Sequence, residues 1–346
     1  MSLEVRTLTD GGQKAAAVAA ELAGFIERAR KTLDLALYDV KLVPGTAAPV
    51  MEALADARKR GVELRLAYNL DFDKPIPVPP PPRVEIEPHE LEVVSKPIPG
   101  IPDLMHHKYA IRDAGAVWTG STNWTDDSWS REENVIVTVE SAAVAAAFGE
   151  DFEQLWRRGK VAGTGKVDPR PEDVGGIPVR SWFCPEHGPA LAHRIAKRLG
   201  EARRRIRIAS PVLTSGPVLG TLAEVAADGR VDVAGVLDGT QIREVYGQWR
   251  ANGRSAWKLD LLGQVLRLAD FSGKPSTPYS PDAVHDYMHA KVTVADDVVF
   301  AGSFNLSHSG EMNAENVLEI EDAKLAEEMV VFVDAVRARY PKAPLP

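Results

Sequence analysis

The chain has 346 residues, 45% of them hydrophobic and 26% charged, and this length predicts two domains or one duplicated unit. The composition excludes intrinsic disorder and a coiled coil as descriptions of the whole chain. The formal net charge of −8 excludes the bulk positive charge with which general nucleic-acid binders attract phosphate backbones. The single cysteine, Cys184, excludes an intramolecular disulfide and a cysteine-rich metal site.

Apolar periodicity predicts the same order of elements in both halves of the chain. The predicted elements of the first half are a helix at 12–30, a strand at 33–37, a helix at 48–60 and a strand that begins at 62. Those of the second half are a helix at 191–199, a strand at 206–208, a helix at 217–228 and a strand that begins at 231. Glycines at 61 and 229 stand where each second helix is expected to end.

Strands that alternate with helices favour an α/β fold. We expect two similar αβαβα-sandwich halves related by a pseudo-twofold axis, each a mixed sheet flanked by helices. The first half is placed at 1–160 and the second at 177–346. The residues between them, 161–176, are rich in glycine, proline and charge without periodicity, which is typical of a linker.

Two long connections separate these elements from the rest of each half. Residues 71–105 hold ten of the 25 prolines, and residues 239–288 hold several large aromatic side chains. Loops of this length inside compact domains are usually functional or mobile. A stiff exposed loop is the expectation for the proline-rich stretch, with a ligand for a proline-reading module as the alternative.

One segment occurs twice. Residues 106–137 and 289–320 each carry a histidine, a lysine two positions later and an aspartate seven positions later. Each copy continues with Gly-Ser-x-Asn and then Glu-Asn before an alternating apolar run. The second copy is one residue shorter between the aspartate and the glycine. This internal repeat predicts that the halves are built alike.

The repeated residues suit a tetrahedral phosphate. Side chains two apart on a strand share a face, so each histidine and its lysine are expected to point the same way, and the asparagine follows the next strand after a small turn. Across a pseudo-twofold axis, two lysines would neutralise charge while asparagines and serines donate to phosphate oxygens. The predicted phosphate ligands are Lys108, Lys291, Asn123, Asn305, Ser121 and Ser303.

Two histidines around one phosphoryl group divide the chemistry. A neutral imidazole attacks phosphorus to form phosphohistidine, while a protonated one gives its proton to the leaving oxygen and then deprotonates water or an alcohol. A carboxylate usually holds the second ring nitrogen of such a histidine. Glu133 and Glu315, at matching distances along the two copies, are the candidates.

At these residues the chain resembles the phospholipase D superfamily, whose signature is His-x-Lys-x4-Asp followed by Gly-Ser-x-Asn. Both copies are complete, and the resemblance covers nearly the whole chain. It implies that the site lies between the halves, that His106 is the nucleophile and His289 the acid and base, and that no metal or other cofactor takes part. It also implies that Asp113 and Asp296 are structural.

The resemblance leaves the substrate open. A phospholipid is favoured, either hydrolysed or transferred as a phosphatidyl group, with contact at a membrane surface. The alternative is a nuclease. A stretch in which basic side chains interleave with aromatic ones has the composition of a surface that stacks on single strands. That stretch holds Arg243, Tyr246, Trp249, Arg250, Arg254, Trp257 and Lys258. A regulatory module that only binds phosphate is a third class.

The sequence carries no signal for secretion or membrane insertion. The N-terminus lacks a basic and apolar leader, and no run of 18 apolar residues occurs. We therefore expect a cytoplasmic protein with no transmembrane segment. No protein partner follows from the sequence.

Overall fold

The computed structural model describes the chain except for residues 71–90, 92, 252, 254 and 281–282. The proline-rich stretch therefore lies outside the described residues. The strands of the first half are β1 (Ser2–Leu8), β2 (Thr32–Leu37), β3 (Val40–Lys41), β4 (Glu63–Leu70), β5 (Val94–Pro99), β6 (Lys108–Arg112), β7 (Ala116–Gly120), β8 (Trp124–Thr125) and β9 (Asn134–Glu140). Its helices are α1 (Ala15–Glu27), α2 (Pro44–Lys59), α3 (Asp126–Ser130) and α4 (Ala142–Arg158).

The second half repeats this order with additions. Its strands are β10 (Pro171–Val174), β11 (Ile177–Phe183), β12 (Arg205–Ser210), β13 (Asp232–Asp238), β14 (Asp270–Lys274), β15 (Val292–Ala295), β16 (Val298–Gly302) and β17 (Asn316–Glu321). Its helices are α5 (Gly188–Glu201), α6 (Gly216–Asp228), α7 (Gly239–Ala251), α8 (Trp257–Leu268), α9 (His308–Met312) and α10 (Ala323–Arg337).

Two mixed sheets carry the duplication. Their strand orders are β1-β9-β7-β6-β2-β4-β5 and β10-β11-β17-β16-β15-β12-β13-β14. In each sheet the strand after the first helix (β2 or β12) pairs in parallel with the strand after the second helix (β4 or β13) and antiparallel with the strand after the motif histidine (β6 or β15). The expected α/β fold with two similar halves is therefore confirmed.

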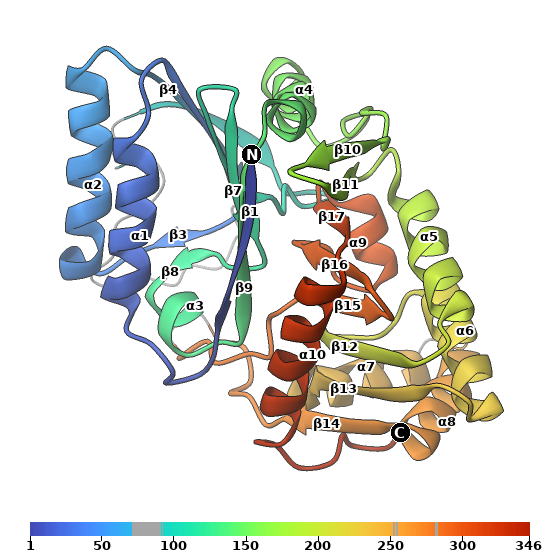
Figure 1. Cartoon of the computed structure of the whole chain (residues 1–346). Helices are drawn as coiled ribbons and strands as arrows, with labels where there is room; N and C mark the ends of the chain where they lie inside the picture. The colour runs from blue at the N-terminus through green and yellow to red at the C-terminus, as the bar shows by residue number, and fades with distance from the viewer. Residues whose placement is uncertain (71–90, 92, 252, 254, 281–282) are drawn as a thin grey trace.

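The helices form layers around the two sheets (Figure 1). Helices α1 and α2 cover the outer face of the first sheet, and α5 and α6 cover the outer face of the second. Helices α4 and α10 lie between the sheets, where their apolar side chains join one core with both inner faces. The αβαβα order thus runs through the whole molecule, and each half contributes one sheet and its helices.

One of the two long connections and the expected linker both contain regular structure. Residues 239–288 contain α7, α8 and β14, and the aromatic side chains of α7 pack inward: Tyr246 and Trp249 are buried in the apolar core that also holds residues of α6 and α8. Within the expected linker, β10 pairs with β11 and extends the second sheet. The exact domain limits stay a prediction.

Candidate active site

The two histidine segments meet where the two sheets face each other. Met105, just before His106, pairs with Ala314 of the other half, and Met288, just before His289, pairs with Glu133. The same two-fold relation holds for the histidines themselves. The backbone N–H of His106 donates to the carbonyl of Ala314 at 2.9 Å, and that of His289 donates to Glu133 at 3.1 Å. Each half therefore fixes the other half's histidine.

Side chains at the ends of β4 and β13 accept hydrogen bonds from the residue that precedes each histidine. Asn69, near the end of β4, accepts from the N–H of Met105 at 3.0 Å. Asp238, at the end of β13, accepts from the N–H of Met288 at 3.0 Å and from Ser276 at 2.7 Å. Burial of Asp238 raises its pKa, although the hydrogen bonds that it accepts oppose the rise. The histidines are thus held from two sides before any substrate enters.

Both histidines open onto one cavity of about 240 Å³. Asn123, after β7, and Asn305, after β16, also line it. The oxygen of each of these two amides is buried and has no hydrogen-bond partner among the described residues. The remaining lining residues are Tyr38, Asp39, Lys41, Thr125, Glu132, Pro211, Gln241, Tyr279, His285 and Tyr287. The structure therefore brings the histidine and asparagine of each copy together, as the sequence predicts.

The two motif lysines lie behind the histidines rather than in the cavity lining. Nζ of Lys108 donates to the carbonyl of His106 at 2.7 Å, and Nζ of Lys291 donates to that of His289 at 2.6 Å. Burial lowers the pKa of Lys108 to about 7, and burial together with the charge of Lys108 lowers that of Lys291. Burial therefore disfavours the charged forms of both lysines, and an anion bound in the cavity would favour them.

The serines of the two copies donate hydrogen bonds to the side chains that contact the histidines, and they do not line the cavity. The Ser121 hydroxyl donates to the Asn134 oxygen at 2.6 Å, and the Ser303 hydroxyl donates to Glu315 at 2.6 Å. Both serines are fully buried and are not part of the cavity lining. Their donors are therefore already used, so the expectation that they bind phosphate finds no support in this geometry.

His106 is held by a carboxylate from the opposite half. Its Nδ1 lies 2.8 and 2.9 Å from the two carboxylate oxygens of Glu315. Burial raises the pKa of Glu315 to about 7 and lowers that of His106, with Lys108 and Lys291 lowering the latter further. When Glu315 is ionised, the proton of this pair resides on Nδ1, so Nε2 is left with a free lone pair.

His289 has a different partner. Its Nδ1 lies 3.2 Å from the Asn134 amide oxygen and 3.4 Å from a Glu132 carboxylate oxygen. Burial lowers the pKa of His289, and the charges of Lys291 and Lys108 lower it further. The histidines are therefore equivalent in the fold but not in their hydrogen bonds.

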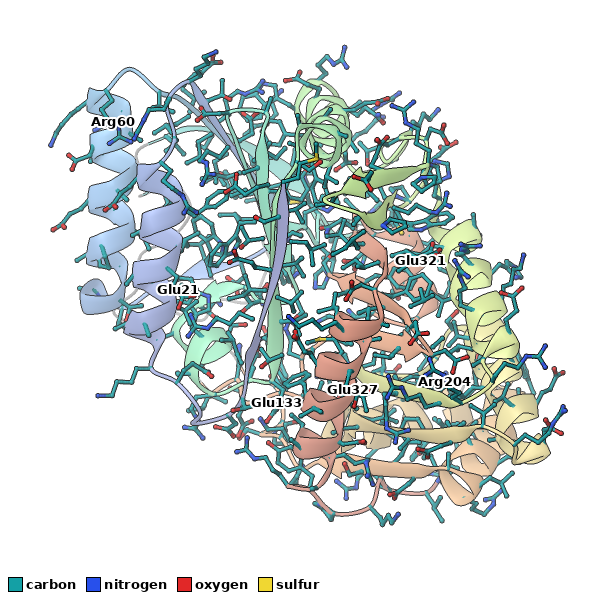
Figure 2. The ribbon with its side chains drawn as sticks, in the orientation of Figure 1. Glu21, Arg60, Glu133, Arg204, Glu321 and Glu327 are labelled. Carbon is teal, nitrogen blue, oxygen red and sulfur yellow. The ribbon has the colours of Figure 1, made fainter. Side chains whose placement is uncertain are left out.

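Glu133 does not reach the His289 ring in this arrangement. Its carboxylate instead binds Nζ of Lys274 at 2.8 Å and the hydroxyl of Tyr340. Figure 2 labels Glu133 next to the lower end of β9, between the two halves. The matching sequence distances misled because the strand registers differ by one residue: Gly120 pairs with Ile136, whereas Gly302 pairs with Val317. Asn134, rather than Glu133, is therefore the counterpart of Glu315.

The motif aspartates lie at tight turns away from the cavity. Asp113, with a φ of 53°, accepts from the backbone N–H groups of residues 30–32 at 2.6–3.1 Å. Asp296, with a φ of 52°, accepts from those of residues 203–205 at 2.8–3.1 Å. Partial burial raises the pKa of both carboxyls, but these hydrogen bonds outweigh it and hold both pKa values below the usual range. This is the structural arrangement that the resemblance implies.

Sequence reasoning missed several cavity residues. Tyr38 follows β2 directly, and its ring lies edge-on 4.6 Å from that of His106. Gln241 follows β13, and Tyr287 stands two positions before His289 in an extended segment. Two general signals pointed to them: ligands bind beyond the carboxyl ends of parallel strands, and residues two apart in extended backbone share a face.

The described residues contain no group of three or more His, Cys, Asp or Glu side chains placed to hold a metal ion. Among the same residues, none of the helices has the length and apolar character needed to cross a bilayer.

Comparison with known families agrees with this fold and this pair of motifs. A family model described as "Cardiolipin synthase, PLD-like domain" matches residues 22–156 and 195–335. The chain therefore belongs to the PLD-like family of the phospholipase D superfamily. The resemblance inferred from the two His-x-Lys motifs is thereby confirmed.

Individual relatives are more distant. The chain is 28% identical to human mitochondrial cardiolipin hydrolase over 135 residues, which is 38% of the chain and 47% of that protein. It is 42% identical to the Xenopus laevis mitochondrial cardiolipin hydrolase over 53 residues, 15% of the chain and 25% of that protein. These matches span less than half of either relative.

A solved structure shares the fold over almost the whole chain. The phosphatidylserine synthase of Haemophilus influenzae superimposes with a TM-score of 0.64 and 12% identity, and the match covers 97% of this chain and 86% of the synthase. At that identity the likeness shows the fold alone.

Proposed function

We propose that the chain is a metal-independent phosphodiesterase of the phospholipase D type that acts on a phospholipid through a phosphohistidine intermediate. The observation that carries this proposal is the shared cavity, onto which His106, His289, Asn123 and Asn305 all open. Membership of the PLD-like family supports the chemistry.

The hydrogen bonds support the following steps. His106, whose Nδ1–H donates to the Glu315 carboxylate, attacks phosphorus through Nε2, and the P–O bond to the leaving group breaks. His289 gives the leaving oxygen a proton and then takes one from water or an alcohol, whose oxygen attacks phosphorus and releases His106. Lys108, Lys291 and the two asparagine amides stabilise the charge on the phosphoryl oxygens.

Two considerations favour a phospholipid. The matched family is described as cardiolipin synthase, and the curated relatives are cardiolipin hydrolases. In addition, two of the three aromatic side chains on which the nuclease alternative depended, Tyr246 and Trp249, are only 3% and 7% exposed, which leaves Trp257 as the exposed one. Arg254 lies outside the described residues. The expected cytoplasmic location stays a prediction.

A side-by-side assay tests the substrate class. The purified chain is incubated with phospholipid vesicles that contain phosphatidylcholine and cardiolipin, with single-stranded DNA and with bis-p-nitrophenyl phosphate. We expect turnover of phospholipid and of the small diester, both abolished by His106→Ala and by His289→Ala. Degradation of DNA with inert vesicles would establish the nuclease alternative instead.

The intermediate has its own test. In His289→Ala, deprotonation of water fails while attack by His106 on a good leaving group continues, so phosphohistidine should accumulate. Phosphorus-31 NMR and acid-labile radiolabel identify it. Label found on a residue other than His106 would show that the nucleophile is assigned wrongly.

A further inference from the structure

The two halves carry the same pair of residue types in exchanged order beside their histidines. Ala314 pairs with Met105 and Glu133 pairs with Met288, so Glu133 and Ala314 occupy equivalent positions in the two halves. Glu132 and Asn134 of the first half therefore correspond to Asn313 and Glu315 of the second. His106 thus meets a carboxylate at 2.8 Å, whereas the nearest partner of the His289 ring is an amide at 3.2 Å, with the Glu132 carboxylate, two positions earlier in the chain, at 3.4 Å.

The hydrogen bonds fix how the Asn134 amide is turned. Its Nδ2 donates to the Glu132 carboxylate at 2.9 Å, to the Ser128 carbonyl at 3.1 Å and to the Ser128 hydroxyl at 3.2 Å. Its Oδ1 accepts from the Ser121 hydroxyl at 2.6 Å and lies 3.2 Å from Nδ1 of His289. A carboxylate has no proton to donate, so it selects the amide's NH₂ end and turns the carbonyl toward the histidine.

We propose that Glu132 is a positioning residue for His289, acting through Asn134. This inference rests on the proposed function. With the Asn134 carbonyl facing Nδ1, the neutral ring carries its proton on Nδ1, and Nε2 is the nitrogen that exchanges a proton with substrate. The protonated ring carries a proton on both nitrogens. As the His106–phosphorus bond forms, its Nε2 proton passes to the leaving oxygen, the neutral ring that remains keeps its Nδ1 proton, and Asn134 neither gains nor loses a proton.

The exchanged order suits the two roles. A nucleophile gains positive charge as it attacks, so direct contact with a carboxylate stabilises its transition state. A general acid must release its proton, and a neutral amide orients the ring without holding that proton as strongly as a carboxylate does.

Other charges act on the same ring and bear on the test. The ionisable groups that influence His289 or Glu132 are Lys291, His285 and Tyr287 from the His289 segment, His106 and Lys108 from the segment entering β6, and Lys274 from β14. Burial raises the pKa of Glu132 to about 7, although hydrogen bonds from Ser128 and Asn134 lower it. The variants below change Glu132, Asn134 or Ser128 and leave the other ionisable groups named here unaltered.

The test uses two diesters that differ in their need for a general acid. Bis-p-nitrophenyl phosphate releases p-nitrophenolate, a stable anion, whereas dihexanoylphosphatidylcholine must release choline as an alkoxide. We expect Glu132→Gln to slow first-step cleavage of the lipid about 10- to 100-fold and to change the p-nitrophenolate burst less than about threefold. A side chain with a merely structural role would slow both substrates equally, and that result would overturn the proposal.

A size-matched exchange variant supplies the control. Glu132→Gln combined with Asn134→Asp keeps one carboxylate and one amide but places the carboxylate directly beside His289. Because a carboxylate also orients the ring but holds its proton more strongly than an amide does, this double variant should recover part of the lipid activity that the single variant loses without reaching the wild-type rate. No recovery would count against the proposal. If Glu132→Gln fails to fold, Ser128→Ala replaces it, because it removes the 2.6 Å bond that holds the carboxylate, and the same selective but smaller loss is expected.

A readout without turnover separates this inference from the proposed function. Nitrogen-15 NMR of histidine-labelled protein reports which ring nitrogen of neutral His289 is protonated. The wild-type chain should show Nδ1–H, and Glu132→Gln should show a mixture of tautomers. An unchanged tautomer overturns the inference whatever the substrate is. If vesicles are inert in wild type, the proposed phospholipid substrate fails, and single-stranded DNA, which also has an alkoxide leaving group, replaces the lipid in the rate comparison.

Discussion

Replacing Glu315 by glutamine is expected to remove most of the nucleophilic power of His106. The amide keeps the size of the side chain but loses the charge that lies 2.8–2.9 Å from Nδ1. Two unit charges about 4 Å apart interact by about 4 kcal/mol at an effective dielectric constant of about 20. His106 gains part of a charge in the transition state, so the loss is about 2–4 kcal/mol, or about 30- to 1,000-fold in rate.

The pH dependence has a definite direction. Nε2 of His106 has a free lone pair only while Glu315 is ionised, and burial raises the pKa of Glu315 to about 7. In wild type the attack on phosphorus should therefore speed up as the pH rises through about 7 and then level off. In Glu315→Gln this inflection should disappear or move to lower pH, because no negative charge remains to favour protonated His106.

The assay is the stopped-flow burst of p-nitrophenolate from bis-p-nitrophenyl phosphate at pH values from about 5 to 9, since this first step needs little help from a general acid. Glu319→Gln is the matched control: Glu319 is also buried, on β17, but its carboxylate binds Arg194 and Arg198 rather than the cavity. The control should lower stability and leave the inflection in place. A Glu315→Gln burst within about threefold of wild type, with an unchanged inflection, would refute the reasoning.

Three further outcomes are expected. Asp113→Asn should lower the free energy of unfolding by about 1 kcal/mol at neutral pH, after allowance for solvent screening. Because folding lowers the pKa of Asp113, this contribution is present above the unfolded pKa and lost as the pH falls through the folded one, so urea unfolding should show the difference shrinking in acid. Gly302→Ala should reduce kcat/KM by tenfold or more, because its Cβ would collide with the carbonyl of Asn316 and shift the Gly-Ser turn; wild-type kinetics would contradict this. Activity on the small diester should survive EDTA because the two-histidine mechanism requires no metal, and a strict requirement for a divalent ion would count against it.

Much of the site could be predicted from the sequence because the duplication repeats a spacing. The interval from histidine to lysine to asparagine is nearly the same in both copies, and two adjacent antiparallel strands fix where those side chains emerge. The shared cavity formed by His106, His289, Asn123 and Asn305 followed from that regularity. The alternation of strands and helices likewise determined the α/β class.

The partners of the histidines could not be predicted in the same way. Glu133 and Glu315 match along the chain, yet a one-residue difference in loop length reverses which face a side chain takes when it enters a strand. The structure therefore places Asn134 and Glu132 at His289, and it turns Glu133 to Lys274 and Tyr340. Similarly, the aromatic residues of α7 look like a stacking surface in sequence and are core residues in the fold.

The sequence by itself determined which residue types the two copies repeat and that the fold is duplicated, since residue type and local periodicity are properties of the chain alone. The tertiary structure decided which half orients which histidine, and that the two histidines are held by unlike groups. Those contacts join residues more than 150 positions apart, and no local pattern encodes them because they depend on how the two sheets come together.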